Sequence, residues 1–152
     1  MLRPDSVGWI CIFTPQTWEQ AADLNFEQAA LPLIRKKAGR RMKVGQPIFP
    51  YITKVQSLAG MLEIVSPAIV SPESSAYGVP GQFPIVIKTK PLYIAKSEHM
   101  LHMKDFVSEL RLFRGLASKK NWTHSIRLSP RELSIGDTEI LRIAVIRTCS
   151  IS

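Results

Sequence analysis

Positively charged side chains gather in one stretch of the sequence, from Leu31 to Lys54, and no carboxylate interrupts the chain between Glu27 and Glu63. Ammonium and guanidinium groups donate hydrogen bonds to phosphate oxygens and attract polyanions. This pattern is typical of nucleic-acid binding, although a solvated loop that only maintains solubility would look the same. We predict phosphate contacts from Arg35, Lys36, Lys37, Arg40, Arg41 and Lys43, with secondary candidates in Lys119, Lys120 and Arg127.

Aromatic residues stand beside these cations. Phe26 precedes the basic stretch, Tyr51 lies near its end, and Trp122 follows a pair of lysines and an asparagine. Flat aromatic faces stack on extruded bases while neighbouring cations hold the phosphates, so this arrangement indicates a site for an unstacked base. The alternative is that each ring belongs to the hydrophobic core. The sequence favours that alternative for Trp18, which lies on the apolar face of a predicted helix.

Other kinds of chemistry find less support in the sequence. Neither the P-loop spacing nor a GxGxxG run occurs. His99 and His102 are spaced to share a helical face, but a metal needs further ligands and no cysteine lies near them. Cys11 lies in an apolar run, which predicts a buried thiol. Because the carboxylates are also scattered, we predict no catalytic residue, no metal and no cofactor.

Size and composition limit the class of protein. A chain of 152 residues, 45% hydrophobic and 21% charged, predicts a single globular domain over residues 1–152. A net charge of +8 and a pI of about 9.8 favour an anionic partner. The 2 cysteines imply no disulfide framework. Since neither a membrane span nor a signal-peptide pattern is found, we expect a soluble, cytoplasmic protein.

The elements that must position these residues begin with a strand over residues 8–13. Thr14 and Pro15 then predict the N-cap and first turn of a helix to about Leu24, which Asn25 ends. The basic stretch follows as a connection, with break points at Gly39 and Gly45. Strands are predicted over residues 47–53, 58–65 and 83–95. Pro50 places the first strand at an edge or a bulge, and Gly60 marks a close backbone approach in the second. The Lys90-Pro91 step interrupts the third strand.

The rest of the chain predicts helices. A short helix fits residues 104–110, an irregular basic segment covers 112–121, and the capping-box spacing of Ser134 and Asp137 begins a last helix that runs to about Ile146. One helix after the first strand, then several strands joined by short loops, predicts an α/β (α+β) fold. We expect a small twisted β-barrel, partly closed, with flanking helices.

Several segments, in the same order, resemble the EVE domain, a member of the PUA-like barrel group related to the YTH and ASCH domains. They read WICI with a following Trp18, MKVGQ leading to Tyr51, GMLEIVSP from Gly60, FPIVIK from Phe83, and KKNW followed by REL at Arg131. The similarity covers about residues 8–147. The resemblance implies a small twisted barrel with peripheral helices and no catalysis of its own.

The resemblance also implies where a ligand binds. Related domains hold a modified base in a pocket at the side of the barrel, flipped out and stacked on aromatic rings. By position, Thr14 corresponds to a residue that reads the base edge. Relatives carry a Trp soon after the first helix; here that position is Glu27, where Phe26 substitutes or the carboxylate accepts from an exocyclic amine. The predicted base pocket is Thr14, Phe26, Glu27, Tyr51 and Trp122.

These inferences predict a non-catalytic domain that binds DNA or RNA carrying a modified, methylated base. Which modification it reads, and whether it acts alone or beside a partner nuclease or a regulatory protein, stay open. Two alternatives remain: an enzyme on the same barrel that acts on RNA or nucleotides, and an interaction module whose basic face binds an acidic protein.

Overall fold

The computed structural model describes residues 5–71, 77–116 and 119–151, with only the backbone at 119, 150 and 151. The elements, with η marking a 3-10 helix, are β1 (Gly8–Phe13), α1 (Pro15–Asp23), β2 (Gln28–Leu31), η1 (Leu33–Arg35), α2 (Lys36–Arg41), β3 (Pro47–Ile52), β4 (Ser57–Leu58), β5 (Gly60–Ile64), β6 (Ile69–Val70), β7 (Ile85–Ile94), η2 (Ser97–His99), β8 (Leu101–His102), η3 (Met103–Phe106), η4 (Arg111–Phe113), η5 (Lys119–Ile126), β9 (Arg131–Leu133) and α3 (Ile135–Ile151).

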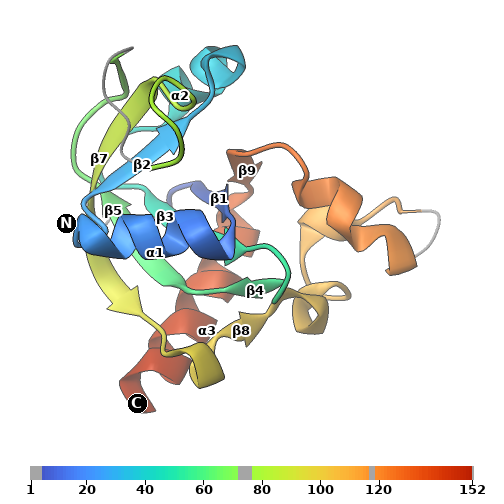
Figure 1. Ribbon diagram of the computed structural model, residues 1–152. Coiled ribbons are helices and arrows are strands. Elements are labelled where there is room, and N and C mark those ends of the chain that lie inside the picture. The colour runs from blue at the N-terminus through green and yellow to red at the C-terminus, as the bar shows by residue number, and fades with distance from the viewer. Residues whose placement is uncertain (1–4, 72–76, 117–118, 152) are drawn as a thin grey trace.

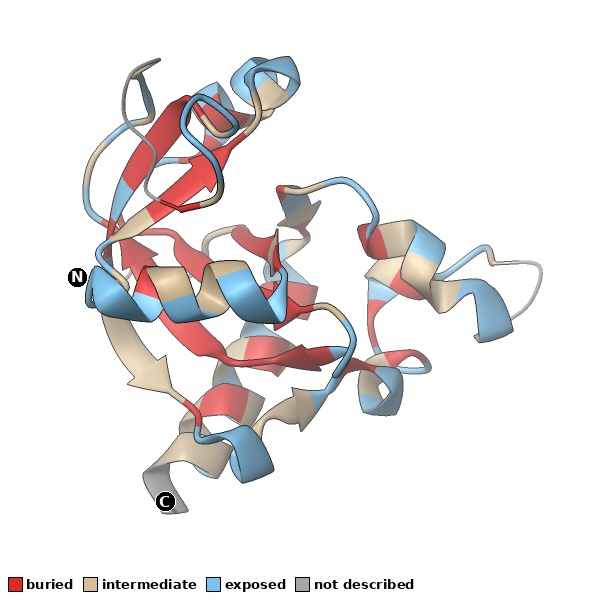
Figure 2. Ribbon diagram, in the orientation of Figure 1, coloured by how far each residue is buried: buried red, intermediate tan, exposed pale blue. Residues whose placement is uncertain are grey.

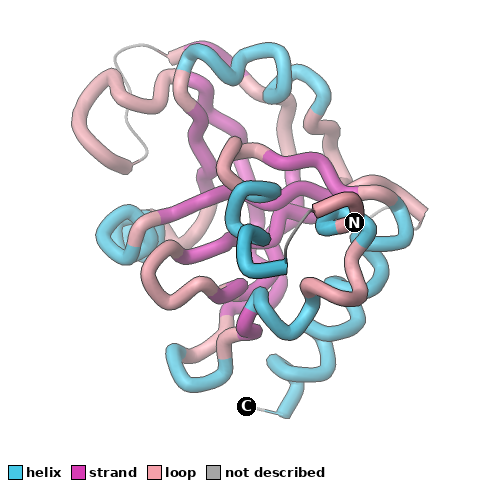
Figure 3. Tube along the Cα trace, turned by 90° about the vertical axis from the view of Figure 1, so that its right-hand side faces the viewer, coloured by secondary structure: helices cyan, strands magenta, loops and turns pink. Residues whose placement is uncertain are grey.

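The strands form a curled sheet in the order β2-β7-β5-β3-β1-β9, with β4, β6 and β8 attached to its members (Figure 1). β1 and β3 run parallel, and the other pairs are antiparallel. Figure 3 shows the strands gathered at the centre, with helical segments around them. The predicted α+β fold, a twisted and partly closed barrel with flanking helices, is confirmed.

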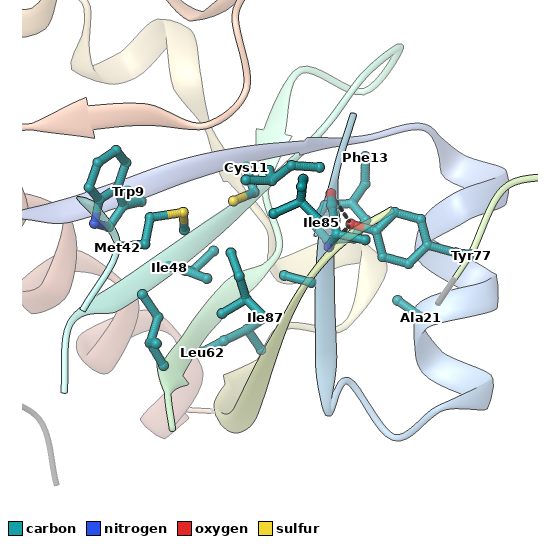
Figure 4. Close-up of a cluster of buried hydrophobic side chains, with 14 of the residues drawn as sticks. Trp9, Cys11, Phe13, Ala21, Met42, Ile48, Leu62, Tyr77, Ile85 and Ile87 are labelled. Atoms are coloured by element: carbon teal, nitrogen blue, oxygen red, sulfur yellow. Dashed lines mark hydrogen bonds between the residues drawn. The ribbon is translucent and has the colours of Figure 1, made fainter. Parts of the chain in front are cut away.

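Side chains of the central strands alternate between two hydrophobic clusters. Trp9, Cys11 and Phe13 of β1 point into the barrel and form an inner cluster, which extends from Trp9 at one end to Tyr77 at the other (Figure 4). Ile10 points the opposite way, into an outer cluster beneath α3 and the 3-10 segments. Buried residues follow most of the strands, whereas the outer sides of α1 and α2 are exposed (Figure 2). The two faces of the parallel β1–β3 pair therefore serve different clusters.

Both ends of α1 form as the sequence predicts. Thr14 is the N-cap: its hydroxyl accepts the Thr17 N–H at 3.0 Å, while the Thr17 hydroxyl accepts the Thr14 N–H at 2.9 Å. Asn25 ends the helix with φ 56°. The N–H groups of Asn25 and Phe26 donate to the carbonyls of Ala22 and Ala21, both at 2.9 Å, which is the Schellman arrangement.

The basic stretch is more regular than the connection we predict. It begins beside β2, an unpredicted strand whose Ala-rich sequence carries little strand propensity. It continues through η1 and α2, so the break expected at Gly39 is wrong. Gly39 lies inside α2, where a Cβ would press on Ile85 at 3.2 Å and Leu31 at 3.3 Å. Gly45 does turn the chain, with φ 89°.

Irregularities in the predicted strands have identifiable causes. β3 is an internal strand, so of the two alternatives predicted for Pro50 the edge is wrong and the bulge is confirmed. The antiparallel register shifts by one residue there, from Ile48 opposite Leu62 to Tyr51 opposite Leu58, as the partner changes from β5 to β4. Ala59 separates β4 from β5, which the sequence predicts as one strand. Gly60 has φ 145°, and a Cβ there would overlap the carbonyl oxygen of Tyr93, which confirms the close approach. The register of β7 shifts opposite Pro91.

The C-terminal third also differs in part. The helix predicted over 104–110 is wrong, because only the short η3 forms there. Of the segment predicted as irregular, η4 covers the start and η5 the end, and residues 117–118 lie outside the described residues. α3 begins near Ser134, whose hydroxyl accepts the Asp137 N–H at 3.1 Å, and it runs beyond Ile146 to Ile151. Among the helices that the structure describes, none combines the length and apolar character needed to cross a membrane.

Candidate nucleic-acid interface

An aromatic cluster closes one end of the barrel. We define it as Phe13, Trp18, Phe26, Tyr77 and Phe83, which come from β1, α1, the turn after α1 and the segment before β7. Ring centroids lie 5.1 Å apart for Phe13–Trp18 and for Phe13–Tyr77, 4.6 Å for Trp18–Phe26 and 5.4 Å for Tyr77–Phe83. Trp18, Phe26 and Phe83 are half-buried, so the cluster reaches from the core to the surface.

Phe26 holds its place in the cluster through a strained backbone. Its φ of 55° is unusual for a bulky side chain. Besides the helix-end bond of its N–H, its carbonyl accepts the Thr89 hydroxyl at 2.8 Å. Together these contacts bring the Phe26 ring against Trp18. Backbone strain that is maintained to present a partly exposed ring is typical of functional sites.

Thr14 and Glu27 lie beside the cluster, each directly adjacent in sequence to one of its members. Thr14 follows Phe13, is exposed, and uses its hydroxyl in the cap of α1. Glu27 follows Phe26 and is exposed, while its backbone carbonyl accepts the Thr89 N–H at 2.9 Å. The structure therefore brings Thr14, Phe26 and Glu27 to one end of the barrel.

Tyr77 anchors the cluster to the outer edge of β2. Its hydroxyl accepts the Ala30 N–H at 2.8 Å and donates to the Ala30 carbonyl at 3.0 Å (Figure 4). Burial raises the pKa of Tyr77, so the phenol stays protonated and keeps its donor. The Gly78 N–H donates to Gln20 Oε1 at 2.7 Å, which fastens the same segment to α1.

Tyr51 and Trp122 lie elsewhere, in the outer cluster. Tyr51 is only 4% exposed, and burial raises its pKa. The Trp122 ring stands edge-on to Tyr51 at 6.5 Å and to Phe113 at 6.1 Å. Because neighbouring strand residues face opposite ways, Tyr51 points away from the inner cluster that Ile52 enters. The residues predicted as one base pocket thus fall into two groups, on opposite faces of β1 and β3.

A groove opens beside Tyr51 on this second face. It has a volume of about 430 Å³. We call it the outer groove; it is lined by Ile12, Tyr51, Thr53, Lys54, Gln56, Thr123, Ile126 and Arg127. Of the predicted residues it therefore unites Tyr51 with the phosphate candidate Arg127, and Trp122 supports its floor from behind Tyr51.

The cations on the basic face of η1 and α2 divide into those whose side chains already bond to other residues and those whose side chains do not. Arg35 donates to the carbonyls of Ser129 at 3.2 Å and Pro130 at 3.0 Å, and Lys43 Nζ donates to the Arg40 carbonyl at 2.9 Å. Arg41 pairs with Glu132 and lies over the Trp9 ring at 5.9 Å.

The side chains of Lys36, Lys37 and Arg40 are different. Within the described part of the chain they are exposed and make no hydrogen bond or ion pair. We call these three the free cations of α2. Unlike their neighbours, they need not break an existing contact to bind a phosphate.

The secondary candidates lie apart from α2. Lys120 is exposed in η5, and Arg127 is exposed just after it. Lys119 begins η5, but its side chain lies outside the described residues. In Figure 1 this orange segment lies at the right of the view and α2 near the top, and the chain after Arg127 returns to η1, where the carbonyls of Ser129 and Pro130 accept from Arg35.

Other chemistry-bearing groups are structural. Burial raises the pKa of Cys11 to about 12, despite the opposing hydrogen bond with Ser129, so the thiol is protonated at neutral pH. His102 Nδ1 lies 3.1 Å from the Ser57 hydroxyl. Over the residues described, no three His, Cys, Asp or Glu side chains gather as metal ligands.

Comparison with known proteins shows the fold. No protein-family model matches the chain, and no curated protein matches its sequence. Protein Atu2648 from Agrobacterium tumefaciens superposes with a TM-score of 0.55 at 17% identity, over 96% of this chain and 92% of that one. The Mmi1 YTH domain, solved with RNA, gives 0.65 at 12% over 95% and 80%. The Pho92 YTH domain, solved with m6A, gives 0.62 at 12% over 93% and 85%. The chain therefore shares the fold of YTH domains.

Sequence reasoning missed three members of the aromatic cluster. Phe13 and Phe83 were expected only as strand residues, and Tyr77 lies between the predicted strands 58–65 and 83–95. Trp18 does pack against the core as predicted, but it also joins the core to the half-exposed Phe26. Aromatic residues that flank turns, rather than any periodic pattern, were the available signal.

Proposed function

We propose that this chain is an EVE-type, PUA-like domain that binds nucleic acid and recognises a modified base at the aromatic cluster. The observation that carries the proposal is Phe26: a strained backbone presents its half-exposed ring on Trp18, at the end of the barrel. Aromatic faces in such a position stack on an unpaired base whatever its sequence context. The ordered resemblance of the strands to the EVE pattern supports the same family.

The ligands of the structural neighbours support a nucleic-acid partner. Mmi1 was solved with RNA and Pho92 with m6A, and both superpose on more than nine-tenths of this chain. These ligands make N6-methyladenosine in RNA the first candidate for this protein. Modified cytosines, and DNA in place of RNA, stay within the proposal because the aromatic cluster alone does not select among them.

Polar groups beside the cluster would supply discrimination. The Glu27 carboxylate is exposed, and a carboxylate accepts hydrogen bonds from an exocyclic amine such as the adenine N6–H or the cytosine N4–H. Thr14 directly follows Phe13 of the cluster, and its hydroxyl is shared with the helix cap. We assign base stacking to Phe26 and Trp18, and reading of the base edge to Glu27 and Thr14.

The free cations of α2 would bind the phosphates of the nucleic-acid strand that carries the recognised base. β2, followed by Pro32 and η1, connects the Phe26 end of the cluster to the start of α2, and the 4 residues of β2 extend over about 13 Å at ~3.3 Å per residue. A strand of a few nucleotides can span that distance, so a base at Phe26 and phosphates at Lys36, Lys37 and Arg40 belong to one footprint. This electrostatic contribution carries no base information.

The proposal is tested with Phe26→Leu, which keeps apolar volume at the helix end but removes the aromatic face. Binding of a short RNA is measured by fluorescence anisotropy with adenosine and with N6-methyladenosine at one position. Loss of one stacking contact, about 1–3 kcal/mol, lowers affinity for the modified strand by roughly five-fold or more.

The matched control is Phe106→Leu, because Phe106 is also half-buried but packs in the outer cluster. It should leave both affinities unchanged. Equal losses for the two variants, or no loss for Phe26→Leu, would remove the aromatic cluster from base recognition.

A further inference from the structure

We infer that the outer groove is a second nucleotide site, which holds the nucleotide next to the recognised base. The inference rests on the proposed function, but it concerns the opposite face of β1 and β3 from the aromatic cluster. The groove volume of about 430 Å³ falls within the usual range for small-molecule sites, about 300–1,000 Å³.

The lining of the groove suits a nucleotide. Its floor is apolar, made by Ile12, Tyr51 and Ile126; Tyr51 and Ile126 are 4% and 2% exposed, so the half-buried Ile12 offers most of the apolar surface for a sugar or base. Lys54 and Arg127 supply positive charge, and none of the lining side chains is a carboxylate that would neutralise it. Hydroxyl and amide groups complete the wall, from Thr53, Gln56 and Thr123. An apolar floor beside cations without a counter-charge fits a ligand that is partly flat and apolar and partly anionic.

The turn that builds one wall is strained. Lys54 and Gln56 have φ values of 68° and 49°, which residues other than glycine rarely adopt. The turn is held by the Val55 N–H on the Thr53 carbonyl at 2.8 Å and by the Ser57 hydroxyl on the Val55 carbonyl at 2.7 Å. Both strained residues line the groove. Strain at two positions of one turn points to function, as it does at Phe26.

The floor of the groove is held rigidly. Ile12 and Tyr51 are register partners on the parallel strands β1 and β3. Trp122 stands edge-on behind Tyr51 and is itself placed against Phe113. A preformed apolar floor lowers the ordering cost of binding. This gives Tyr51 and Trp122 a role as supports of the groove rather than as walls of the base pocket.

The two sites meet at the C-terminal end of β1. Phe13 is the last residue of β1 and enters the aromatic cluster, while its neighbour Ile12 lines the groove on the other face. The Thr53 N–H donates to the Phe13 carbonyl at 2.9 Å, so the groove wall is bonded to the residue that begins the cluster. A nucleic-acid strand that crosses the end of β1 places one base in the aromatic cluster and the adjacent nucleotide in the outer groove.

The test removes the negative charges of a short RNA one phosphate at a time. Single phosphates of a short RNA centred on N6-methyladenosine are replaced by neutral methylphosphonates, and each strand is bound to the wild type and to Lys54→Ala/Arg127→Ala. Both residues are exposed, so the variant should fold normally. We expect one linkage next to the modified base to cost several-fold in affinity with the wild type and nothing with the variant. Such non-additivity identifies a direct contact.

The control variant is Lys96→Ala/Arg114→Ala, which removes the same charge from exposed positions elsewhere. It should keep the wild-type methylphosphonate profile. If the groove variant also keeps that profile while RNA binds, the groove inference is overturned and the proposed function stands.

A separate arm decides the case in which no oligonucleotide binds and the proposed function falls. Backbone amide spectra are then recorded with 5′-AMP. Shifts at Thr53, Gln56 and Thr123 that the groove variant abolishes would assign the groove to a free nucleotide, and absence of such shifts would remove it as a nucleotide site.

Discussion

At the scale of single residues, Phe26 and Cys11 show how burial and backbone shape decide what a side chain can do. Phe26 is forced into the left-handed region so that its ring meets Trp18 at the surface. Cys11 has the reactive group of a nucleophile, but it points into the inner cluster beside Phe13. The first residue is available for recognition, whereas the second only fills space.

The cysteines give a direct check of these environments. Burial raises the pKa of Cys11 to about 12, so almost no thiolate exists near pH 8. Cys149 is only half-buried, and burial raises its pKa as well. We expect iodoacetamide to modify Cys149 slowly and Cys11 only after denaturation, as measured by peptide mass spectrometry. Modification of Cys11 in the native protein at the rate of Cys149 would contradict its position in the inner cluster.

At the scale of elements, α1 links the fold to the site. Thr14 is its N-cap and Asn25 turns the chain just after its C-cap, so both ends lie at residues of the proposed base pocket. The helix carries Trp18 on the face that meets Phe13 and Phe26. The capping bonds therefore hold the helix and orient the pocket together.

Loss of the N-cap should be measurable. Thr14→Ala removes the acceptor of the Thr17 N–H and should lower the free energy of unfolding by about 1 kcal/mol, read from urea denaturation. Gln16→Ala, an exposed change in the same turn, should stay within about 0.5 kcal/mol of the wild type. Equal stability of Thr14→Ala and the wild type would mean that the cap bonds contribute little.

Local signals explain which elements the sequence could predict. β1 and both ends of α1 follow from an apolar run and from capping residues that act over a few positions. β2 was not predicted because Ala29 and Ala30 have little strand propensity and are buried by pairing with β7, a segment distant in the sequence. Likewise, Tyr51 was predicted to share a pocket with Phe26, because the sequence does not show that the β1–β3 pair separates them. Contacts between distant segments are what a pattern along the chain cannot supply.

At the scale of the whole molecule, the proposed function assigns general attraction of nucleic acid to the net charge and base selectivity to the fold. The net charge of +8 attracts a polyanion from any direction. The curled sheet then places the free cations of α2, the aromatic cluster and the outer groove on different elements of one framework. Under the proposed function, affinity and selectivity come from separate parts of the surface, and they should respond to different substitutions.

The salt dependence of binding tests that division. The triple variant Lys36→Ala/Lys37→Ala/Arg40→Ala removes the free cations of α2. It should flatten the slope of log affinity against log salt by about 2, since each phosphate contact on a single strand contributes about 0.7. The ratio of affinities for modified and plain strands should not change.

Another triple variant provides the control for this experiment. Lys96→Ala/Lys104→Ala/Arg114→Ala loses the same charge from exposed positions away from α2. We expect it to keep the wild-type slope. Equal flattening by both variants would mean that the protein attracts nucleic acid only through its overall charge.

The measurement that tests the central claim most directly is the affinity ratio of the wild-type protein for matched strands at one moderate salt concentration. The strands carry N6-methyladenine, 5-methylcytosine or 5-hydroxymethylcytosine, or the plain base, as RNA and as DNA. A stacked and hydrogen-bonded base contributes about 1–3 kcal/mol, so we predict a preference of roughly tenfold or more for one modified strand. Equal binding to every strand, lost together at high salt, would contradict recognition of a modified base.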